Sequence, residues 1–187
     1  MIDNINIFEN FLSTEECGNI LNKCKEELTL SDAKVYNNNS NTLQTKTTRK
    51  SSIGWISDLG FLNKRLTNKL RETFNINGME VTGIGPFQFT EYKEGEYFDW
   101  HTDANNDVYR DRFTSIVIQL NNTYEGGTLE IKNPKGELVP IENKIGTLYI
   151  FNSRLTHRVT SVVSGVRYSL VNWISLVRTD STKRNLL

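Results

Sequence analysis

Apolar residues recur every three or four positions in the first third of the chain, which predicts amphipathic helices there. The first helix is expected to begin at the segment Ser13–Glu16, whose Ser-x-x-Glu spacing fits a capping box. Between the helices, a polar stretch from Asn37 to Thr42 indicates a loop. The apolar positions of the two expected helices are Cys17, Ile20, Leu21, Cys24 and Leu28, then Leu59, Leu62, Leu66, Leu70 and Phe74.

From Phe87 onward the period of the pattern changes to two, which is typical of β-strands. After this first strand, further strands are expected at residues 113–121, 128–132, 147–151, 156–163 and 167–175, separated by glycine- and asparagine-rich turns. Helices first and short strands afterwards favour an α+β, mainly β protein, a jelly roll with N-terminal supporting helices. We expect a single domain over residues 1–187, helical to about residue 80 and with its jelly-roll core at about 81–178.

The net charge and the absence of a long apolar run limit the classes of partner that this chain is expected to bind. The chain has 22 Lys and Arg and 22 Asp and Glu, so its formal net charge is zero, which argues against a general nucleic-acid binder. No run approaches the roughly 18 apolar residues of a membrane span, and acidic Asp3 and Glu9 stand where a signal peptide would be basic. We therefore expect a soluble, cytoplasmic protein with neither nucleic acid nor membrane as a partner.

The two cysteines, Cys17 and Cys24, lie on the first expected helix. At about 1.5 Å rise per residue they would be roughly 10 Å apart, which is too far for a disulfide. Because no CxxC spacing is present, two small apolar side chains on a buried helix face are favoured over a metal or redox pair.

The chain contains two histidines, and one of them opens the sequence His101-Thr102-Asp103. Two imidazoles and one carboxylate are the ligand set of a non-haem Fe(II) site, which leaves positions open for a co-substrate and oxygen. The i, i+2 spacing lets His101 and Asp103 leave an extended strand on the same side, and His157 would come from a strand across the barrel. Taken singly, His101 could be a turn histidine and His157 a hydrogen-bonded core histidine, since a lone HxD is a weak motif.

Arg167 belongs to a strand whose one face also carries Ser169, Val171 and Trp173. An arginine that points into a barrel is costly unless it meets an anion, and a guanidinium can bind a carboxylate through two parallel hydrogen bonds. The distal carboxylate of 2-oxoglutarate would supply that anion, with Ser169 as a second donor. The alternative is a surface arginine on a sheet whose other face is buried, because the opposite face of the strand is also largely apolar.

Several segments resemble prolyl 4-hydroxylase-like members of the Fe(II)/2-oxoglutarate-dependent oxygenase superfamily. Tyr92–Asp103 resembles their Tyr-x-x-Gly approach to the HxD motif, and Tyr124–Leu129 looks like their Gly-Gly-x-Leu strand entry. Phe151–Trp173 is similar to their distal segment, and Phe11–Cys17 resembles their N-terminal helix entry. The resemblance spans most of the chain and is densest from Phe87 to Ile174.

This resemblance implies a double-stranded β-helix, the jelly-roll variant of the family. It makes His101, Asp103 and His157 the iron ligands and Arg167 the anchor of the co-substrate. Arg167 stands where collagen-type enzymes carry lysine, so a collagen-like substrate does not follow. Tyr92 matches a tyrosine that contacts 2-oxoglutarate in relatives, although an ordinary aromatic of the core is an equal alternative.

The activity implied by the resemblance is hydroxylation of a prime substrate with release of succinate and CO2. The implied cofactors are Fe(II), 2-oxoglutarate and O2, with ascorbate as an optional addition. A peptidyl proline in a peptide or protein partner is favoured, and a free amino acid or another small molecule is the alternative. A zinc hydrolase using the same three ligands and a non-catalytic jelly-roll binding module are the rival classes.

Two polar segments, Asn37–Ser52 and Ala104–Arg112, are expected to be mobile and to flank the mouth of the site. Within the first, Thr48–Ser52 loosely resembles a substrate-side segment of these enzymes. A solvated basic loop is the favoured interpretation of that short segment.

Overall fold

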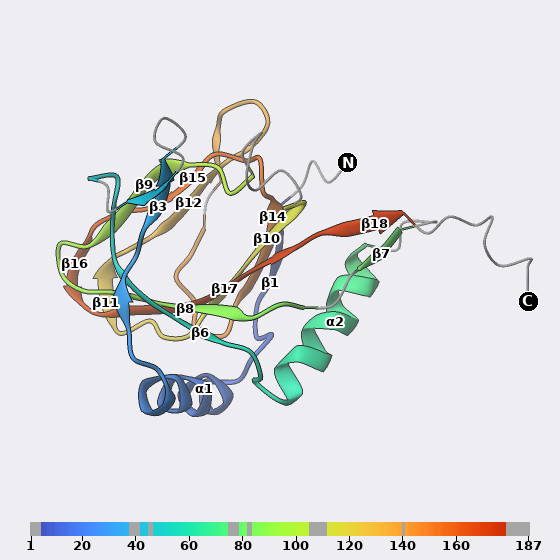
Figure 1. Ribbon diagram of the computed structural model, residues 1–187, viewed down its shortest axis with the longest axis horizontal. Helices are drawn as coiled ribbons and strands as arrows, with labels where there is room; N and C mark the ends of the chain where they lie inside the picture. Colours follow the sequence, from blue (N-terminus) through green and yellow to red (C-terminus); the bar gives the residue numbers. More distant parts are fainter. Residues whose placement is uncertain are drawn as a thin grey trace, which may run out of the picture.

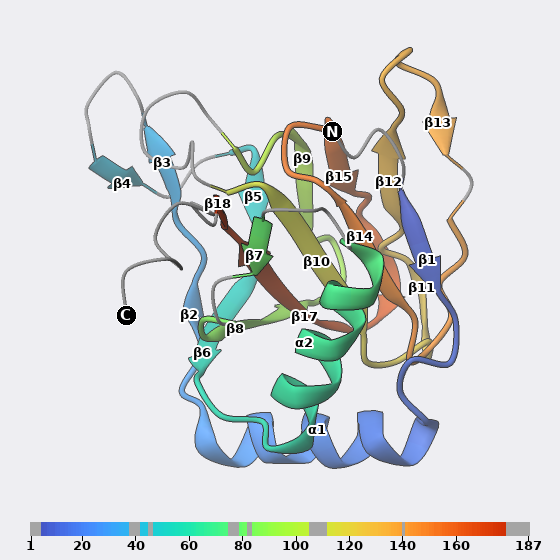
Figure 2. The same ribbon diagram turned by 90° about the vertical axis from the view of Figure 1, so that its right-hand side faces the viewer.

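Two helices lie against one face of a large antiparallel sheet in the computed structural model of the chain (Figure 1). The structure describes residues 5–37, 42–44, 47–74, 79–81, 84–104, 112–139 and 141–178. A second, smaller sheet faces the other side of the large one (Figure 2). This arrangement confirms the predicted α+β, mainly β jelly roll, although the described strands do not close into a barrel.

The helices are α1 (Thr14–Glu27) and α2 (Phe61–Thr73). The predicted capping box begins α1, because the hydroxyl of Ser13 accepts a hydrogen bond from the Glu16 amide and the Glu16 carboxylate accepts one from the Ser13 amide. Arg65 of α2 forms an ion pair with Glu16 at 2.7 Å, which joins the two helices. No helix in the described part of the chain is long and apolar enough to span a membrane.

The large sheet has seven strands, and its helix-facing side buries the main hydrophobic core. In order across the sheet, these strands are β1 (Asn6–Phe8), β14 (Leu148–Asn152), β10 (Thr114–Gln119), β17 (Arg167–Ile174), β8 (Phe87–Tyr92), β6 (Ser52–Ile56) and β2 (Ser31–Asp32).

The smaller sheet has five strands, and a second core fills part of the space between the two sheets. Its strands are β13 (Leu138–Val139), β12 (Leu129–Lys132), β15 (His157–Val159), β9 (Tyr97–His101) and β5 (Arg49–Lys50). The remaining pairs are β11 (Tyr124–Gly126) with β16 (Val162–Gly165), β7 (Met79–Val81) with β18 (Leu176–Arg178), and β3 (Val35–Asn37) with β4 (Thr42–Gln44).

The N-terminal part is less helical than the sequence predicted. Strands β1, β2 and β6 add to the large sheet, and β5 adds to the small one. These strands have two to five residues and most of their partners lie far along the chain, so they leave no local period to detect. The loop expected at Asn37–Thr42 falls mostly outside the described residues, as does most of Ala104–Arg112.

The single strand predicted at 156–163 is two strands in different sheets. β15 pairs with β12 and β9, whereas β16 pairs with β11. The chain changes sheets at Ser161, whose carbonyl accepts a hydrogen bond from the Gly127 amide. A Cβ at the neighbouring Gly126 would collide with that carbonyl, and Gly126 has a φ of +68°, so the Gly-Gly pair permits this close crossing.

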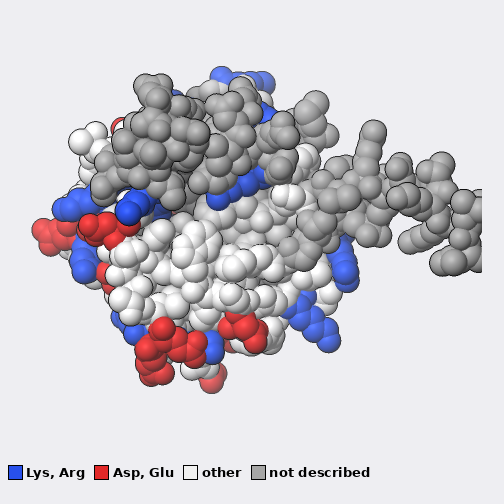
Figure 3. All heavy atoms as spheres, viewed as in Figure 1, with Lys and Arg blue, Asp and Glu red and all other residues white. Residues whose placement is uncertain are grey.

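Acidic and basic side chains lie in small groups on the face seen in Figure 3, and no large field of one sign is visible there. This mixture agrees with the zero formal net charge of the chain.

The cysteine thiols give a first testable prediction. Cys17 and Cys24 are both fully buried in α1 and unpaired, and burial raises the pKa of each thiol to about 11. At pH 8 only about 0.1% of each thiol would be thiolate, the reactive form. We expect a chromogenic disulfide reagent to release no signal from the folded chain within minutes and two equivalents after unfolding in guanidinium. Rapid labelling of the folded chain would contradict the buried placement.

Candidate active site

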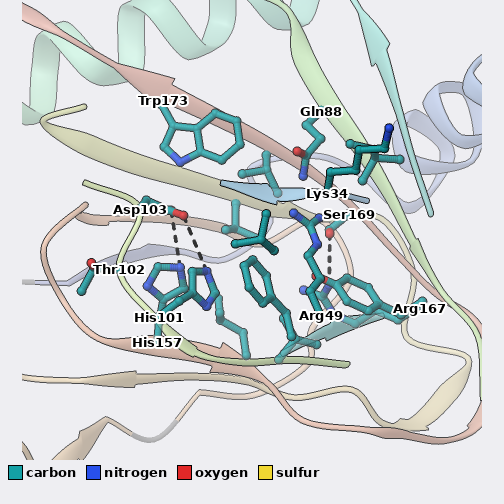
Figure 4. Close-up of a pocket in the computed structure, with 18 of the residues that line it drawn as sticks. Lys34, Arg49, Gln88, His101, Thr102, Asp103, His157, Arg167, Ser169 and Trp173 are labelled. Atoms are coloured by element: carbon teal, nitrogen blue, oxygen red, sulfur yellow. Dashed lines mark hydrogen bonds and ion pairs between the residues drawn. The ribbon is translucent and has the colours of Figure 1, made fainter. Parts of the chain in front are cut away.

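The two histidines and Asp103 converge where strands β9 and β15 run side by side (Figure 4). His101 is the last residue of β9 and His157 the first of β15, and the two are direct cross-strand partners. The prediction that His157 comes from a strand across the barrel is therefore wrong, because it comes from the adjacent strand of the same sheet. The residues between them build strands β10 to β14 before the chain returns beside β9.

The spacing of these three side chains fits one metal ion. Asp103 Oδ1 lies 3.6 Å from His101 Nε2, and its Oδ2 lies 3.4 Å from His157 Nε2. All three ligand atoms lie within 4.8 Å of one another. Ligands about 2.1 Å from one ion are themselves roughly 3 Å or a little more apart, so the cluster can close around a divalent cation with small shifts.

Backbone carbonyls fix the tautomer of both imidazoles. The Nδ1 of His101 lies 2.7 Å from the Asp99 carbonyl oxygen, and the Nδ1 of His157 lies 2.9 Å from that of Leu155. A carbonyl can only accept, so Nδ1 must carry the proton in each ring. The lone pair of each neutral imidazole is then on Nε2, the atom that faces Asp103, which is the arrangement a metal ligand needs.

Asp103 is held by two serines from the large-sheet side, Ser115 on β10 and Ser153 directly after β14. Its carboxylate accepts a 2.6 Å hydrogen bond from the Ser115 hydroxyl on β10, and its amide donates to the Ser153 carbonyl. Burial alone would raise the pKa of Asp103, but the two histidines outweigh it and hold that pKa well below its usual range. The aspartate therefore remains an anion, ready to bind a cation.

The two imidazoles are in unlike electrostatic surroundings. Burial, and then the neighbouring His157, lowers the pKa of His101. Burial would also lower the pKa of His157, but the charge of Asp103 outweighs it and raises that pKa. Ser115 and Ser153, which support Asp103, were not identified from the sequence. The sequence feature that could have indicated them is a serine within a strand, or at the end of one, where a buried side chain is expected.

A cavity of about 420 Å³ extends from the metal-ligand cluster between the two sheets. All six site residues proposed from the sequence line it, namely Tyr92, His101, Asp103, His157, Arg167 and Ser169. Arg49 and Arg112, which belong to the two segments expected at the mouth, line it as well.

Arg167 is a buried cation without an anion in the described chain. Its side chain is 1% exposed, and one terminal nitrogen donates to the Ser169 hydroxyl at 3.0 Å. Its Nε and other terminal nitrogen have no hydrogen-bond partner there, and no described carboxylate forms an ion pair with it. Since a buried, unpaired guanidinium is costly, this end of the cavity is suited to a carboxylate ligand.

Aromatic side chains and a glycine shape the space around this guanidinium. Its carbon lies 5.4 Å from the centre of the Tyr92 ring, and Tyr92 is buried. The buried Tyr124 hydroxyl lies beside the guanidinium, and burial raises the pKa of this phenol while the charge of Arg167 opposes the increase. A Cβ at Gly127 would lie 3.1 Å from Arg167 Cδ, so the absence of a side chain leaves room for the arginine. Tyr124 was not proposed as a site residue, although it begins the Tyr-Glu-Gly-Gly motif.

The alternation predicted for β17 is confirmed. Arg167, Ser169, Val171 and Trp173 all line the cavity, while Tyr168, Leu170 and Ile174 of the opposite face pack in the helix-facing core. The interpretation of Arg167 as a surface arginine is therefore wrong. Both faces of this central strand lie inside the protein, which is why apolar residues occur on both and Arg167 and Ser169 are buried.

The sequence favoured a solvated loop for Thr48–Ser52, but the structure places Arg49 in a strand. It belongs to β5, and its Nε donates to the Ser51 hydroxyl at 2.9 Å. Its guanidinium lies 4.5 Å from the centre of the Phe98 ring, and that ring stacks on His101. The order of this segment comes from pairing with β9, which the local sequence does not reveal.

Comparison with known proteins agrees with this geometry. Residues 87–175 match the model of the 2OG-Fe(II) oxygenase superfamily. A PKHD-type hydroxylase of Thermosynechococcus vestitus is 34% identical over 110 residues, which cover 56% of this chain and 49% of that protein. The chain thus spans about half the length of this curated relative.

Two solved structures share the fold. A Pseudomonas putida prolyl-4-hydroxylase superposes with a TM-score of 0.70 at 22% identity and 91% coverage of both chains. A Trichoplax adhaerens prolyl hydroxylase, in complex with a peptide fragment of the hypoxia inducible factor oxygen degradation domain, gives 0.73 at 21% identity, covering 93% of this chain and 84% of that one. The chain therefore matches the 2OG-Fe(II) oxygenase superfamily over residues 87–175, carries a His-Asp-His cluster where β9 and β15 meet, and has the double-stranded β-helix fold of the solved prolyl hydroxylases.

Proposed function

We propose that the chain, as a single domain, is an Fe(II)- and 2-oxoglutarate-dependent dioxygenase that hydroxylates a peptidyl proline and releases succinate and CO2. One observation carries the proposal: a His-Asp-His cluster lines the same cavity as a buried guanidinium that meets no anion among the described residues. A metal site alone would explain the cluster but not Arg167. A co-substrate that binds metal at one end and presents a carboxylate at the other explains both.

The cavity residues fall into a metal-binding group and a co-substrate-binding group. His101, Asp103 and His157 would hold Fe(II) through the two Nε2 atoms and the carboxylate. Arg167, with the Ser169 hydroxyl, would bind the distal carboxylate of 2-oxoglutarate, and the Tyr92 ring would form the adjoining wall. Bound iron, 2-oxoglutarate and O2 together supply an oxidising power that side chains lack. The protein orients the reactants and excludes water between two buried sheet faces.

The substrate class rests on the aromatic side chains of the cavity. Trp55 and Trp173 both line it, with ring centres 6.2 Å apart. Aromatic-lined grooves commonly receive proline-containing segments in peptide-binding proteins. The peptide complex of the Trichoplax relative in fold is consistent with a peptide in this place. A free amino acid is the alternative substrate.

The direct test is incubation of the purified chain with Fe(II), 2-oxoglutarate, O2 and proline-containing peptides, with and without ascorbate. We expect succinate to form only when Fe(II) is present, and one peptide to gain one oxygen atom by mass spectrometry. A zinc hydrolase would cleave a substrate without forming succinate, and a binding module would do neither. Hydroxylation of free proline but of no peptide would transfer the proposal to the small-molecule alternative.

A further inference from the structure

The part of the cavity not used by metal and co-substrate carries an excess of positive charge. Among the described lining residues, the carboxylates are Asp32 and Asp103, and the permanent cations are Lys34, Arg49, Arg112 and Arg167. Asp103 faces the two histidines, and Arg167 is assigned to the co-substrate. Arg112 packs on the Trp173 ring and has another contact, so it is left out of the count. Among the described lining residues, Lys34 and Arg49 then face the prime substrate with one carboxylate, Asp32, which leaves an excess of positive charge.

Two of these cations have no carboxylate partner in the part of the chain that the structure describes. Lys34 is exposed at the cavity, and neither it nor Arg49 forms an ion pair with any residue that the structure describes. Arg49 is held in position by the Ser51 hydroxyl and by the Phe98 ring, which stacks on His101 with ring centres 3.5 Å apart. A cation is thereby fixed beside the ring that packs on a metal ligand.

An unsatisfied donor lies on the opposite wall. The indole N–H of Trp173 is buried and has no hydrogen-bond partner in the described chain. Trp173 is the cross-strand partner of Ser115, whose hydroxyl binds Asp103, and Figure 4 shows the Trp173 ring in the cavity that Lys34 and Arg49 also line. Because a buried donor without an acceptor is costly, a ligand in this place is expected to offer an oxygen atom to the indole.

We infer that the prime substrate carries a carboxylate close to the group that is oxidised, bound by Lys34 and Arg49, and offers an oxygen acceptor to Trp173. This inference rests on the proposed function, since it concerns the substrate of that same site. A carboxylate would neutralise the excess positive charge, whereas a basic substrate would add to it. The carboxylate can come from an acidic side chain of a peptide or from a small acid such as a free amino acid.

The test compares three labelled peptides that differ only in an Asp, Asn or Lys beside the same proline, with binding followed by fluorescence anisotropy without O2. Two partly exposed charge pairs should make the Asp peptide bind roughly 3–10-fold more tightly than the Asn peptide. The preference should shrink as salt rises, because salt screens such pairs. A second series compares proline with prolinamide by competition, which reports a preference for a small acid.

Charge reversal at one position provides the sharpest comparison. Lys34→Glu should remove the preference for Asp over Asn and improve binding of the Lys peptide. Lys64→Glu is the matched control, because Lys64 is an exposed lysine of α2 that does not line the cavity, and it makes the same change in net charge. Lys34→Gln should give an intermediate preference for the Asp peptide over the Asn peptide. Because glutamine introduces no negative charge, this variant keeps the inference testable if Lys34→Glu does not fold.

The outcomes separate this inference from the proposed function, because binding is read without turnover. Preference for the acidic member of either series supports the inference, and the series in which it occurs identifies the source of the carboxylate. Equal binding in both series, or equal effects of Lys34→Glu and Lys64→Glu, overturns it. If the chain forms succinate but binds the acidic and neutral members equally, the proposed function stands and the inference is wrong. If the chain prefers the acidic member but never forms succinate, the proposed function is wrong.

Discussion

Arg167→Ala is expected to weaken 2-oxoglutarate binding by tens to thousands of fold while leaving iron binding intact. Arg167 is 1% exposed, and the only hydrogen bond of its guanidinium in the described chain goes to the neutral Ser169 hydroxyl. Removal of one member of a buried, hydrogen-bonded charge pair costs about 2–5 kcal/mol, and each 1.4 kcal/mol is about tenfold in affinity. Iron binding should persist, because Arg167 is not a metal ligand.

The measurement is an anaerobic titration of 2-oxoglutarate into the Fe(II)-loaded chain, followed by the metal-to-ligand absorption band. Arg167→Lys should be intermediate, since it keeps the charge but loses the two-pronged geometry. Arg71→Ala is the matched control, because Arg71 is exposed on α2 and does not line the cavity. Wild-type affinity in Arg167→Ala would remove the main reason for preferring an oxygenase to a zinc hydrolase or a binding module.

A thermal measurement offers a second readout of the same change. In wild type, 2-oxoglutarate should raise the melting temperature of the metal-loaded chain, because a ligand of the folded state stabilises it by mass action. This increase should be largely absent in Arg167→Ala. The unliganded variant should lose little stability from the missing charge, since the buried cation it lacks was without an anion in the described chain.

The sequence predicts the strands that carry the site because their patterns are local. Alternation along β17 predicted that Arg167 and Ser169 share one face, and the structure places that face on the cavity. The Ser13 capping box likewise depends on residues only three apart. Signals of this kind need no knowledge of the partner strand, since side-chain period and cap chemistry are properties of a short segment.

Features that depend on distant pairing could not be predicted in the same way. Strand β5 is two residues long and is ordered by β9, so Arg49 resembled part of a solvated loop. His157 pairs directly with His101 although strands β10 to β14, which belong to several sheets, separate them along the chain. The hydroxyl of Ser115 reaches Asp103 from the large sheet, a contact that neither sequence segment records alone.

His157→Ala is expected to abolish turnover and to lower the iron content of the purified chain. His157 is 5% exposed, and its Nδ1–H donates to the Leu155 carbonyl. Its Nε2 is therefore the atom that is free to bind a metal ion. The variant would leave one imidazole and the Asp103 carboxylate, a set that holds iron poorly. Loss of even an outer partner of a metal ligand costs about 10–100-fold in affinity or activity, so loss of a ligand should cost more than about 100-fold.

The control for this variant is the next residue of the same strand. Arg158 forms an ion pair with Glu130 at 2.7 Å and lies over the Trp100 ring, and it does not line the cavity. Arg158→Ala should therefore retain iron, because it perturbs β15 without touching the cluster. Metal content after desalting, measured by mass spectrometry, and succinate release from 2-oxoglutarate would be compared for the two variants. Normal iron content and wild-type succinate release in His157→Ala would show that the cluster is not the metal site, since no other described histidine, cysteine or acidic group completes it.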